Sequence, residues 1–502
     1  MDAQRACRGV EARSERAMMG AGLENPLSGA ASRPSFIDGM LAPIAGAPEA
    51  MPDVPSTPGQ IFSGYLVVFV VAFLVTVLAT PVMRMLAVKN GVVDQPSEAR
   101  KVHRIPIAYL GGVAVYLGLL AAIAFSYVFF EMNPGGPLKL LSQHESAHDQ
   151  LTVPFSILLG MTVIMITGLI DDVVGLDPRL KIAGQLLAAA ALAMENVGTK
   201  VAAGVMLPVA DAMGIPTVEM VSNGQVVETL GFVISMPGIS PIPIDFVYWV
   251  GTAIIAIGVL GACNASNLID GLDGLLSGVT AIAAAGLLII ALAMAANDDG
   301  HLDGSRIVLA MAVLGACLGF LPHNFNPATI FLGDCGSLLL GYMSIAVILT
   351  MGDTGKTHLV VAGLIIYAIP IIDTALAIIR RKMAGKPMSA PDDQHLHHML
   401  KRALGVKGAA FAIYGIGTVF AALGVWLSMG RLRVVFTVAL VVTVFIWVTA
   451  VKVARRQAIE LAATGGKAPS GKPKHQHDEP ESGEAAGAPA SVGYPEPEPA
   501  SP

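Results

Sequence analysis

Charged residues are scarce in this chain. Asp, Glu, Lys and Arg make up 14% of its 502 residues, whereas soluble domains carry roughly 25%. Hydrophobic residues reach 54%, and the mean hydropathy is +0.66. This balance excludes an ordinary soluble domain and predicts a protein embedded in the lipid bilayer. The net charge of −6 combines an acidic C-terminal tail with basic links between apolar runs, so we expect no nucleic-acid partner.

Cysteine is also scarce, and its positions exclude two kinds of site. The four cysteines are widely spaced, which predicts neither a disulfide framework nor a cysteine-based metal site. Residues 1–59 lack the hydrophobic segment of a signal peptide and are rich in Ala, Gly, Pro and Ser. We expect 1–59 to be a disordered N-terminal extension, 60–456 an integral membrane domain and 457–502 a disordered cytoplasmic tail.

Long apolar runs, in contrast, are abundant between the two tails. A helix needs about 20 apolar residues to cross a bilayer. Eleven segments are candidates, and the fourth is the shortest and begins beside Lys181. The candidate spans are residues 61–88, 107–130, 153–170, 180–195, 246–263, 275–296, 305–322, 335–351, 357–379, 409–429 and 433–453.

Basic residues set the predicted orientation of these spans. Lys and Arg are concentrated in the links 84–106 and 380–408 and after the last span, which places these segments in the cytoplasm. The long link 197–245 then lies outside, and its Asn223-Gly224 pair predicts the turn of a β-hairpin. The expected fold is an all-α polytopic membrane protein with about 11 transmembrane helices, an outside N-terminus, an inside C-terminus and a small extracytoplasmic β-hairpin.

Four polar clusters fall at cytoplasmic ends of spans in this topology. The first is GLIDDVVGLDPRLK, which has adjacent carboxylates at Asp171 and Asp172 and ends on Lys181. It can be an ordinary helix end reaching the interface. However, two like charges in a partly desolvated site raise one pKa unless a cation shares them. We therefore favour a functional carboxylate pair, with Lys181 sharing its charge or contacting a phosphate.

The second cluster is NASNLIDGLDG, directly after the fifth span. Asn264, Asn267, Asp270 and Asp273 recur every three residues, so a continuous helix would place them roughly on one face. A single amide can simply join two helices inside a membrane. Four polar groups on one stripe instead predict a functional site, because ionisable groups in membranes are costly to bury.

The third cluster is FLGDCGS, directly before the eighth span. Asp334 lies between glycines and close to the start of the predicted helix. One interpretation is that Asp334 only caps this helix. The other is a binding site, because a helix N-terminus with free N–H groups suits an anion such as phosphate.

The fourth cluster is DDQHLHH, in a link that also contains Arg380. His395, His397 and His398 allow three interpretations: a zinc site, a solvated basic loop, or contact with a diphosphate. The absence of a nearby cysteine and the adjacency of His397 and His398 disfavour zinc. Diphosphate contact is the preferred interpretation. Asp373, within the ninth span, is expected to support this loop or line the site.

The four clusters together indicate phosphoryl transfer on one membrane face, because carboxylates suit Mg²⁺ and Mg²⁺ bridges them to phosphates. Together with RKVHRIPIAYLGG (100–112), they occur in the order of a known family. Over residues 61–455 the chain resembles the polyprenyl-phosphate N-acetylhexosamine-1-phosphate transferases of glycosyltransferase family 4. Within that family it is most similar to the bacterial undecaprenyl-phosphate GlcNAc-1-phosphate transferases.

The resemblance implies an enzyme of the bacterial inner membrane with its active site on the cytoplasmic face. Its substrates would be UDP-GlcNAc, or another UDP-HexNAc, and undecaprenyl phosphate. Its products would be undecaprenyl-diphospho-HexNAc and UMP, in the first membrane step of cell-surface polysaccharide synthesis. Mg²⁺ is the expected cofactor, with Mn²⁺ as an alternative. The sequence does not decide between a monomer and a homodimer.

The resemblance also implies residue roles within 60–456, the expected phosphoglycosyltransferase domain. Asp334 is the principal metal ligand and Asn267 the second, while Asp171 or Asp172 is the base that deprotonates or orients the lipid phosphate. The expected substrate-binding residues are Lys181, Asn264, Asp270, Asp273, His395, His397 and His398.

Two alternatives for the function remain open at this point. A phospho-MurNAc-pentapeptide transferase of peptidoglycan synthesis would use the same chemistry on another sugar. A proton-coupled transporter would place its acids near the middle of the spans, whereas these acids lie at span ends. The mechanism is expected to be a direct in-line displacement, and its rival is a two-step route through a phosphorylated aspartate.

Overall fold

The computed structural model describes residues 57–94, 106–132, 153–222, 225–236, 239–297, 302–383, 385 and 395–463. These residues belong to one compact unit. Most of the two predicted tails, 1–59 and 457–502, lies outside the described residues. Helix α2 begins at Pro58 and helix α14 continues to Ala463, so both helices extend into ranges that the sequence analysis assigned to tails.

Helices dominate the described residues, as the sequence predicts. The α-helices are α2 (Pro58–Lys89), α3 (Gly111–Met132), α4 (Phe155–Val174), α5 (Pro178–Met194), α6 (Ala203–Met213), α7 (Phe246–Ile269), α8 (Leu275–Ala295), α9 (Asp303–Asn324), α10 (Gly333–Thr350), α11 (Thr357–Ile366), α12 (Ala368–Met383), α13 (Leu396–Ser428) and α14 (Leu432–Ala463). Among the described residues, nine helices are long and apolar enough to cross a membrane, or up to 11 if each of two bent pairs counts as one span. The prediction of an all-α polytopic membrane protein is confirmed.

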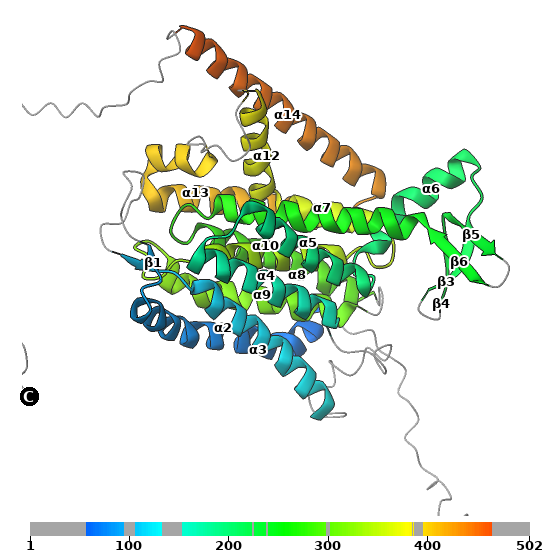
Figure 1. The fold of residues 1–502 in the computed structure, drawn as a ribbon, viewed down its shortest axis with the longest axis horizontal. Coiled ribbons are helices and arrows are strands. Elements are labelled where there is room, and N and C mark those ends of the chain that lie inside the picture. Colours follow the sequence, from blue (N-terminus) through cyan, green and yellow to red (C-terminus); the bar gives the residue numbers. More distant parts are fainter. Residues whose placement is uncertain are drawn as a thin grey trace, which may run out of the picture. The chain divides into compact units, whose positions relative to one another are not determined.

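One predicted span, 357–379, is bent rather than straight, and another, 180–195, is followed by a bend. Helix α5 and the segment Thr199–Met213 meet at 79°, and α11 and α12 meet at 78°. The prediction of one continuous helix over 357–379 is therefore wrong, because the chain leaves helical geometry at Tyr367. Helix α12 consequently turns away from the bundle (Figure 1). This bend matters for the site because α12 carries Asp373.

The start of α13 also differs from the predicted span 409–429. The helix begins at Leu396 and contains a kink at Gly405, whose φ is +71°. Its first turn therefore includes His397 and His398, which the sequence analysis placed in a loop. The kink separates this short histidine-bearing helix from the apolar part that follows.

Burial divides the helices into a centre and a periphery. In α10, 89% of the apolar stretch that could cross the membrane is buried inside the protein, compared with 6% of the corresponding stretch in α14. Large apolar side chains such as Leu78 on α2 and Phe445 on α14 are exposed. Such an outer surface suits lipid, which is as apolar as these side chains. The polar site described below lies at the ends of the more central helices.

Short strands lie at both ends of the bundle. They are β1 (Val93–Asp94), β2 (Ile107–Ala108), β3 (Val218–Ser222), β4 (Gln225–Thr229), β5 (Gly231–Met236) and β6 (Ile239–Asp245). They pair antiparallel as β1–β2, β3–β4 and β5–β6. The predicted turn residues Asn223 and Gly224 lie between β3 and β4 but outside the described residues. Strands β3 to β6 and helix α6 lie at the end of the bundle opposite to β1 (Figure 1).

Candidate active site

The first turn of α10 is the point around which the site is built. Gly333, its first residue, has a φ of +72°, a left-handed conformation that favours glycine. A Cβ atom at this position would lie 2.5 Å from a carboxylate oxygen of Asp172. That carboxylate accepts hydrogen bonds from the backbone N–H groups of Asp334 (2.7 Å) and Cys335 (2.9 Å). Asp172, near the end of α4, thus satisfies donors that a helix N-terminus leaves unpaired.

Asp334 lies at the centre of a group with surplus negative charge. Lys181, in the first turn of α5, pairs with Asp334 and also with Asp171, whose Oδ2 is 2.9 Å from the Lys181 Nζ. Asn267, near the end of α7, donates from Nδ2 to Asp334 Oδ1 at 2.8 Å. The Asp334 side chain is 34% exposed, so a ligand can reach it. We call Asp171, Asp172, Lys181, Asn267 and Asp334 the acid cluster.

Tyr109 reaches the acid cluster from the link before α3. Phe331 donates its N–H to the Ala108 carbonyl at 2.9 Å, and Gly111 donates its N–H to the Phe331 carbonyl at 3.0 Å. These bonds join the IPIAYLGG motif to the segment that leads into α10. The pKa of the Tyr109 hydroxyl lies above its usual range, mainly because the group is buried and next because the carboxylate of Asp94 is near. The carboxylates of Asp172 and Asp334 raise this pKa further.

The stripe predicted along NASNLIDGLDG is interrupted. Helix α7 ends at Ile269 and α8 begins at Leu275. Asp270 and Asp273 therefore lie in the link between the two helices, and the predicted continuous helical face is wrong. The physical reason is the pair of glycines in this link, since glycine favours the end of a helix.

The polar side chains of this motif consequently have different surroundings. Asn264 donates from Nδ2 to Gln185 Oε1 at 2.8 Å, a contact between α7 and α5. Asp273 accepts hydrogen bonds from Asn326 Nδ2 (2.8 Å) and the Ala328 N–H (3.1 Å). These bonds hold the two helices together and fix the link before α10. Asn264 and Asp273 thus contact neighbouring helices and links, Asn267 belongs to the acid cluster, and the predicted substrate-binding roles of Asn264 and Asp273 stay predictions.

Asp270 is the acid of this link that responds to the acid cluster. Burial, and then repulsion led by Asp334, raises the pKa of Asp270 from 3.8 to about 8. Burial is the main reason that this carboxyl group resists ionisation, and the negative charge of the acid cluster adds to the effect.

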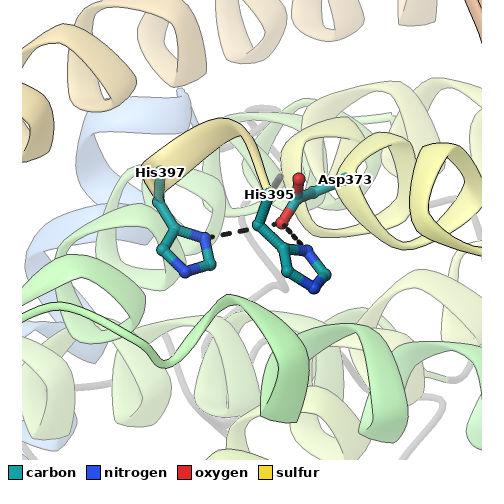
Figure 2. A group of neighbouring side chains, drawn as sticks. All are labelled: Asp373, His395 and His397. Carbon is teal, nitrogen blue, oxygen red and sulfur yellow. Dashed lines mark hydrogen bonds and ion pairs between the residues drawn. The ribbon is translucent and has the colours of Figure 1, made fainter. Parts of the chain in front are cut away.

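The predicted histidines gather around Asp373 (Figure 2). The Nδ1 atoms of His395 and His397 lie 3.0 Å and 3.6 Å from Asp373 Oδ2. Leu396, the first residue of α13, donates its N–H to Asp373 Oδ1 at 2.9 Å. The ring centroid of His398 is 4.2 Å from that of His397. We call Asp373, His395, His397 and His398 the histidine cluster.

The two clusters meet along the end of α7 and the link after it. A Cβ atom on Gly271 would lie 2.6 Å from Nε2 of His397, so the imidazole packs directly against the backbone next to Asp270. Asn267, a few residues earlier, belongs to the acid cluster. The structure thus places all three predicted histidines and the predicted metal ligands around one short stretch of chain.

Two groups of side chains in the described residues offer ligands for a cation. The acid cluster offers carboxylate and amide oxygens, the ligand type that Mg²⁺ prefers. In the histidine cluster, the ligand atoms of Asp373, His395 and His397 all lie within 4.8 Å of one another, the nitrogen-rich type that suits zinc. The three-histidine zinc site weighed from the sequence is replaced here by two histidines and one carboxylate.

Some residues of the site were not singled out from the sequence. Ser337 accepts a hydrogen bond from Asn267 Nδ2 at 3.0 Å, and its position one turn after Asp334 was an available signal. Tyr109 lies inside a motif that was identified only for its resemblance. Tyr367 and Ser266 share a buried hydrogen bond between their hydroxyl groups. This last contact has no local sequence signal, because it depends on the bend before α12.

Similarity to known proteins extends over most of this chain. The family model of glycosyl transferase family 4 matches residues 154–352. A decaprenyl-phosphate N-acetylglucosaminephosphotransferase from Mycolicibacterium smegmatis is 31% identical over 392 residues, which cover 75% of this chain and 86% of that protein. The chain belongs to glycosyl transferase family 4. The resemblance drawn from the motifs is therefore confirmed.

Other family 4 relatives differ in the substrate that their names give. A probable undecaprenyl-phosphate N-acetylglucosaminyl 1-phosphate transferase from Bacillus subtilis is 29% identical over 390 residues, covering 77% of this chain and 91% of that protein. A phospho-N-acetylmuramoyl-pentapeptide-transferase from Bacillus cytotoxicus is 28% identical over 379 residues, covering 73% of this chain and 98% of that protein. The family 4 model spans the whole acid cluster but ends before the histidine cluster.

Proposed function

We propose that this protein transfers GlcNAc-1-phosphate from UDP-GlcNAc to undecaprenyl phosphate, giving undecaprenyl-diphospho-GlcNAc and UMP. The observation that carries the proposal is the acid cluster, built from the ends of four helices and adjoined by three histidines within a family 4 chain. Relatives named for GlcNAc-1-phosphate transfer reach 31% and 29% identity, compared with 28% for the muramoyl-pentapeptide enzyme. The similarity therefore favours GlcNAc over MurNAc-pentapeptide.

The acid cluster fits Mg²⁺, which we propose as the cofactor, with Mn²⁺ as the alternative. Two carboxylates share one ammonium group there and the third, Asp172, accepts backbone N–H groups, so a divalent cation would balance the remaining charge. Asp334 and Asn267 are the proposed ligands. When bound, the ion would neutralise charge on the diphosphate and on the departing UMP.

The reaction is proposed as a direct in-line displacement. An oxygen of the lipid phosphate forms a bond to the β-phosphorus of UDP-GlcNAc. The bond from that phosphorus to the bridging oxygen breaks, and UMP leaves with the electron pair. Of the two candidate bases, we assign Asp171, because its Oδ2 faces Lys181 inside the acid cluster while only Oδ1 accepts a backbone N–H, whereas both oxygens of Asp172 cap α10. Lys181 lies beside Asp171 and can contact the lipid phosphate.

The histidine cluster is proposed to face the diphosphate of the donor. His398 is the more exposed of its histidines, since His395 and His397 are buried. Asp270 lies between the two clusters and would contact the nucleotide side. We place the reaction on the cytoplasmic face of the bacterial inner membrane, because the histidine residues of the site belong to the link 380–408, which is rich in Lys and Arg. Homodimer formation stays a prediction.

An assay with two donors tests this function. Membranes containing the full chain are incubated with undecaprenyl phosphate, Mg²⁺ and either radiolabelled UDP-GlcNAc or radiolabelled UDP-MurNAc-pentapeptide. We expect lipid-linked label and UMP from UDP-GlcNAc, and none in membranes with Asp334→Asn. Label from the muramyl donor alone would overturn the choice of sugar. A phospho-aspartate trapped with UDP-GlcNAc in the absence of lipid would overturn the one-step route.

A further inference from the structure

Asp373 is a buried carboxylate to which the proposed reaction gives no role. It lies within α12, and its side chain is 1% exposed. Oδ1 accepts the Leu396 N–H and Oδ2 lies at hydrogen-bond distance from His395 Nδ1. Burying such a carboxylate is costly unless it is paired. The contacts that compensate the cost all come from the segment that carries the histidines.

The geometry around Asp373 fixes the orientation of two imidazole rings. A carboxylate accepts hydrogen bonds, so a neutral histidine facing it carries its proton on Nδ1 and leaves Nε2 as the second functional atom. His395 Nδ1 lies at the hydrogen-bond distance of 3.0 Å from Asp373 Oδ2, whereas His397 Nδ1 lies 3.6 Å from the same oxygen, too far for a direct hydrogen bond. Figure 2 shows that the two rings come from the same turn of the chain and point their other nitrogen away from Asp373.

The far side of these rings meets the link that joins the two clusters. The Nε2 edge of His397 packs against Gly271, where a Cβ atom would be only 2.6 Å away. Tyr367, the residue before α12, is anchored to α7 through its hydrogen bond with Ser266. The first part of α12 is therefore attached to an element that carries the site, and Asp373 attaches it to the histidines.

A metal ion is the competing occupant of the same three side chains. The 3.0 Å separation of His395 Nδ1 and Asp373 Oδ2 is the length of a direct N–H···O hydrogen bond. A second acceptor atom of Asp373 is committed to the backbone at the start of α13. Asp373 thus accepts one hydrogen bond from His395 and one from the backbone, and these two bonds favour a hydrogen-bonded carboxylate over a zinc site.

We propose that Asp373 is a positioning residue that holds the His395 imidazole by a direct hydrogen bond, and through it the stacked His397 ring, on the side of the site that receives the diphosphate of the uridine-diphosphate donor. It acts only through these rings and does not itself contact substrate. The inference rests on the proposed function, because it assumes a uridine-diphosphate donor. The sequence analysis expected Asp373 to support the histidine link or line the site, and the inference specifies that Asp373 orients the imidazole rings.

The test measures UDP binding by isothermal titration calorimetry on the full chain in detergent with Mg²⁺. At metal sites, mutating a residue that orients a ligating histidine typically lowers the affinity or the activity by 10- to 100-fold. By analogy, Asp373→Asn should weaken UDP binding by about 10-fold. The matched control is Asp353→Asn, which neutralises another buried aspartate, one that pairs with Lys200. It should leave the UDP affinity unchanged. Thermal unfolding of each variant checks that it is folded.

A double variant that lacks both imidazoles serves as a second background, and it separates a positioning role of Asp373 from a general structural role. Asparagine keeps a donor near the position of histidine Nδ1 but has no Nε2, so His395→Asn/His397→Asn retains the contact with Asp373 and removes the presented atoms. In this background Asp373→Asn should change UDP affinity by less than about 2-fold, since outer partners act through the group they orient. An equal loss in both backgrounds, or no loss in the wild-type background, would overturn the inference.

Two further outcomes are distinguishable. One zinc per wild-type chain by elemental analysis, absent from Asp373→Asn, would replace the positioning role by a metal site. A wild-type chain that binds no UDP would overturn the proposed function, and the inference with it. Normal UDP binding and GlcNAc transfer, with Asp373→Asn indistinguishable from wild type, would overturn the inference alone.

Discussion

The acid cluster and the histidine cluster use the same structural device with opposite charge balance. Each contains an aspartate that accepts backbone N–H groups at the start of a helix: Asp172 at α10 and Asp373 at α13. In the acid cluster, carboxylates outnumber cationic groups. In the histidine cluster, one carboxylate faces two imidazoles. The first composition suits a divalent cation, and the second leaves nitrogen atoms available for an anionic donor.

The two clusters also differ in how the chain assembles them. The acid cluster combines the ends of α4, α5, α7 and α10, which are far apart in sequence. The histidine cluster comes from α12 and the first turn of α13, which are close in sequence. The predictions below test whether this division between cation side and anion side is functional.

The largest effect is expected from Asp334→Asn. It removes the charge at the centre of the acid cluster, and losing such preorganised electrostatic stabilisation costs about 10³-fold in kcat. The measurement is turnover of UDP-GlcNAc by equal amounts of folded protein. Activity within a few-fold of wild type would contradict the assignment of Asp334 as a metal ligand.

The next effect separates the adjacent aspartates. Asp171→Asn should lower kcat by about 10²-fold, the contribution of a general base, with little change in the unfolding temperature. Asp172→Asn should also lower the unfolding temperature, because it weakens the cap of α10 by about 1 kcal/mol. A variant of Asp172 that loses turnover without losing stability would move the role of base from Asp171 to Asp172.

A smaller effect is expected from Gly271→Ala. Its Cβ atom would lie 2.6 Å from Nε2 of His397, so the ring must shift. We expect the KM for UDP-GlcNAc to rise by about 10-fold, or roughly 1.4 kcal/mol. Gly261→Ala on α7 is the matched control, because nothing lies within 4 Å of its Cβ position. Equal KM values in the two variants would mean that His397 does not act on the donor.

The smallest effect is a dependence of stability on pH. The folded-state pKa of Asp270 is about 8, above its ordinary 3.8, so the folded state retains this proton over a range in which the unfolded state has lost it. Stability from this group is therefore fully present below the ordinary pKa of 3.8 and is lost, by roughly 1.4 kcal/mol per pH unit, as pH rises from there to the folded pKa of about 8. With EDTA present, Asp270→Asn should flatten the fall in unfolding temperature between about pH 5 and 8. Parallel curves for wild type and variant would contradict the raised pKa of Asp270.

Much of the fold followed from local sequence. Runs of apolar residues located the helices, because crossing a bilayer requires about 20 such residues. The bend at Tyr367 could not be predicted in this way, since residues 357–379 are apolar on both sides of it. The end of α7 was missed for a related reason: three-residue spacing suggested a helix through Asp273, while Gly271 and Gly274 favoured its end.

The site was predicted as a set of residues rather than as an arrangement. The motifs identified Asp334, Asn267 and Lys181, which the structure brings into contact. They did not separate Asp171 from Asp172, because that difference depends on the backbone N–H groups of α10, a distant element. The position of Asp373 against His395 likewise depends on the direction of α12 after its bend.

The most direct test of the division between the clusters is the Mg²⁺ dependence of turnover in Asn267→Ala and Asp373→Asn. Each variant is assayed over a series of Mg²⁺ and UDP-GlcNAc concentrations. Asn267→Ala should raise the Mg²⁺ concentration for half-maximal turnover by about 10-fold and leave the KM for UDP-GlcNAc within about 2-fold at saturating Mg²⁺. Asp373→Asn should raise the KM for UDP-GlcNAc by about 10-fold and leave the Mg²⁺ concentration for half-maximal turnover within about 2-fold. Equal shifts of both quantities in both variants, or the opposite assignment, would contradict a cation side and an anion side.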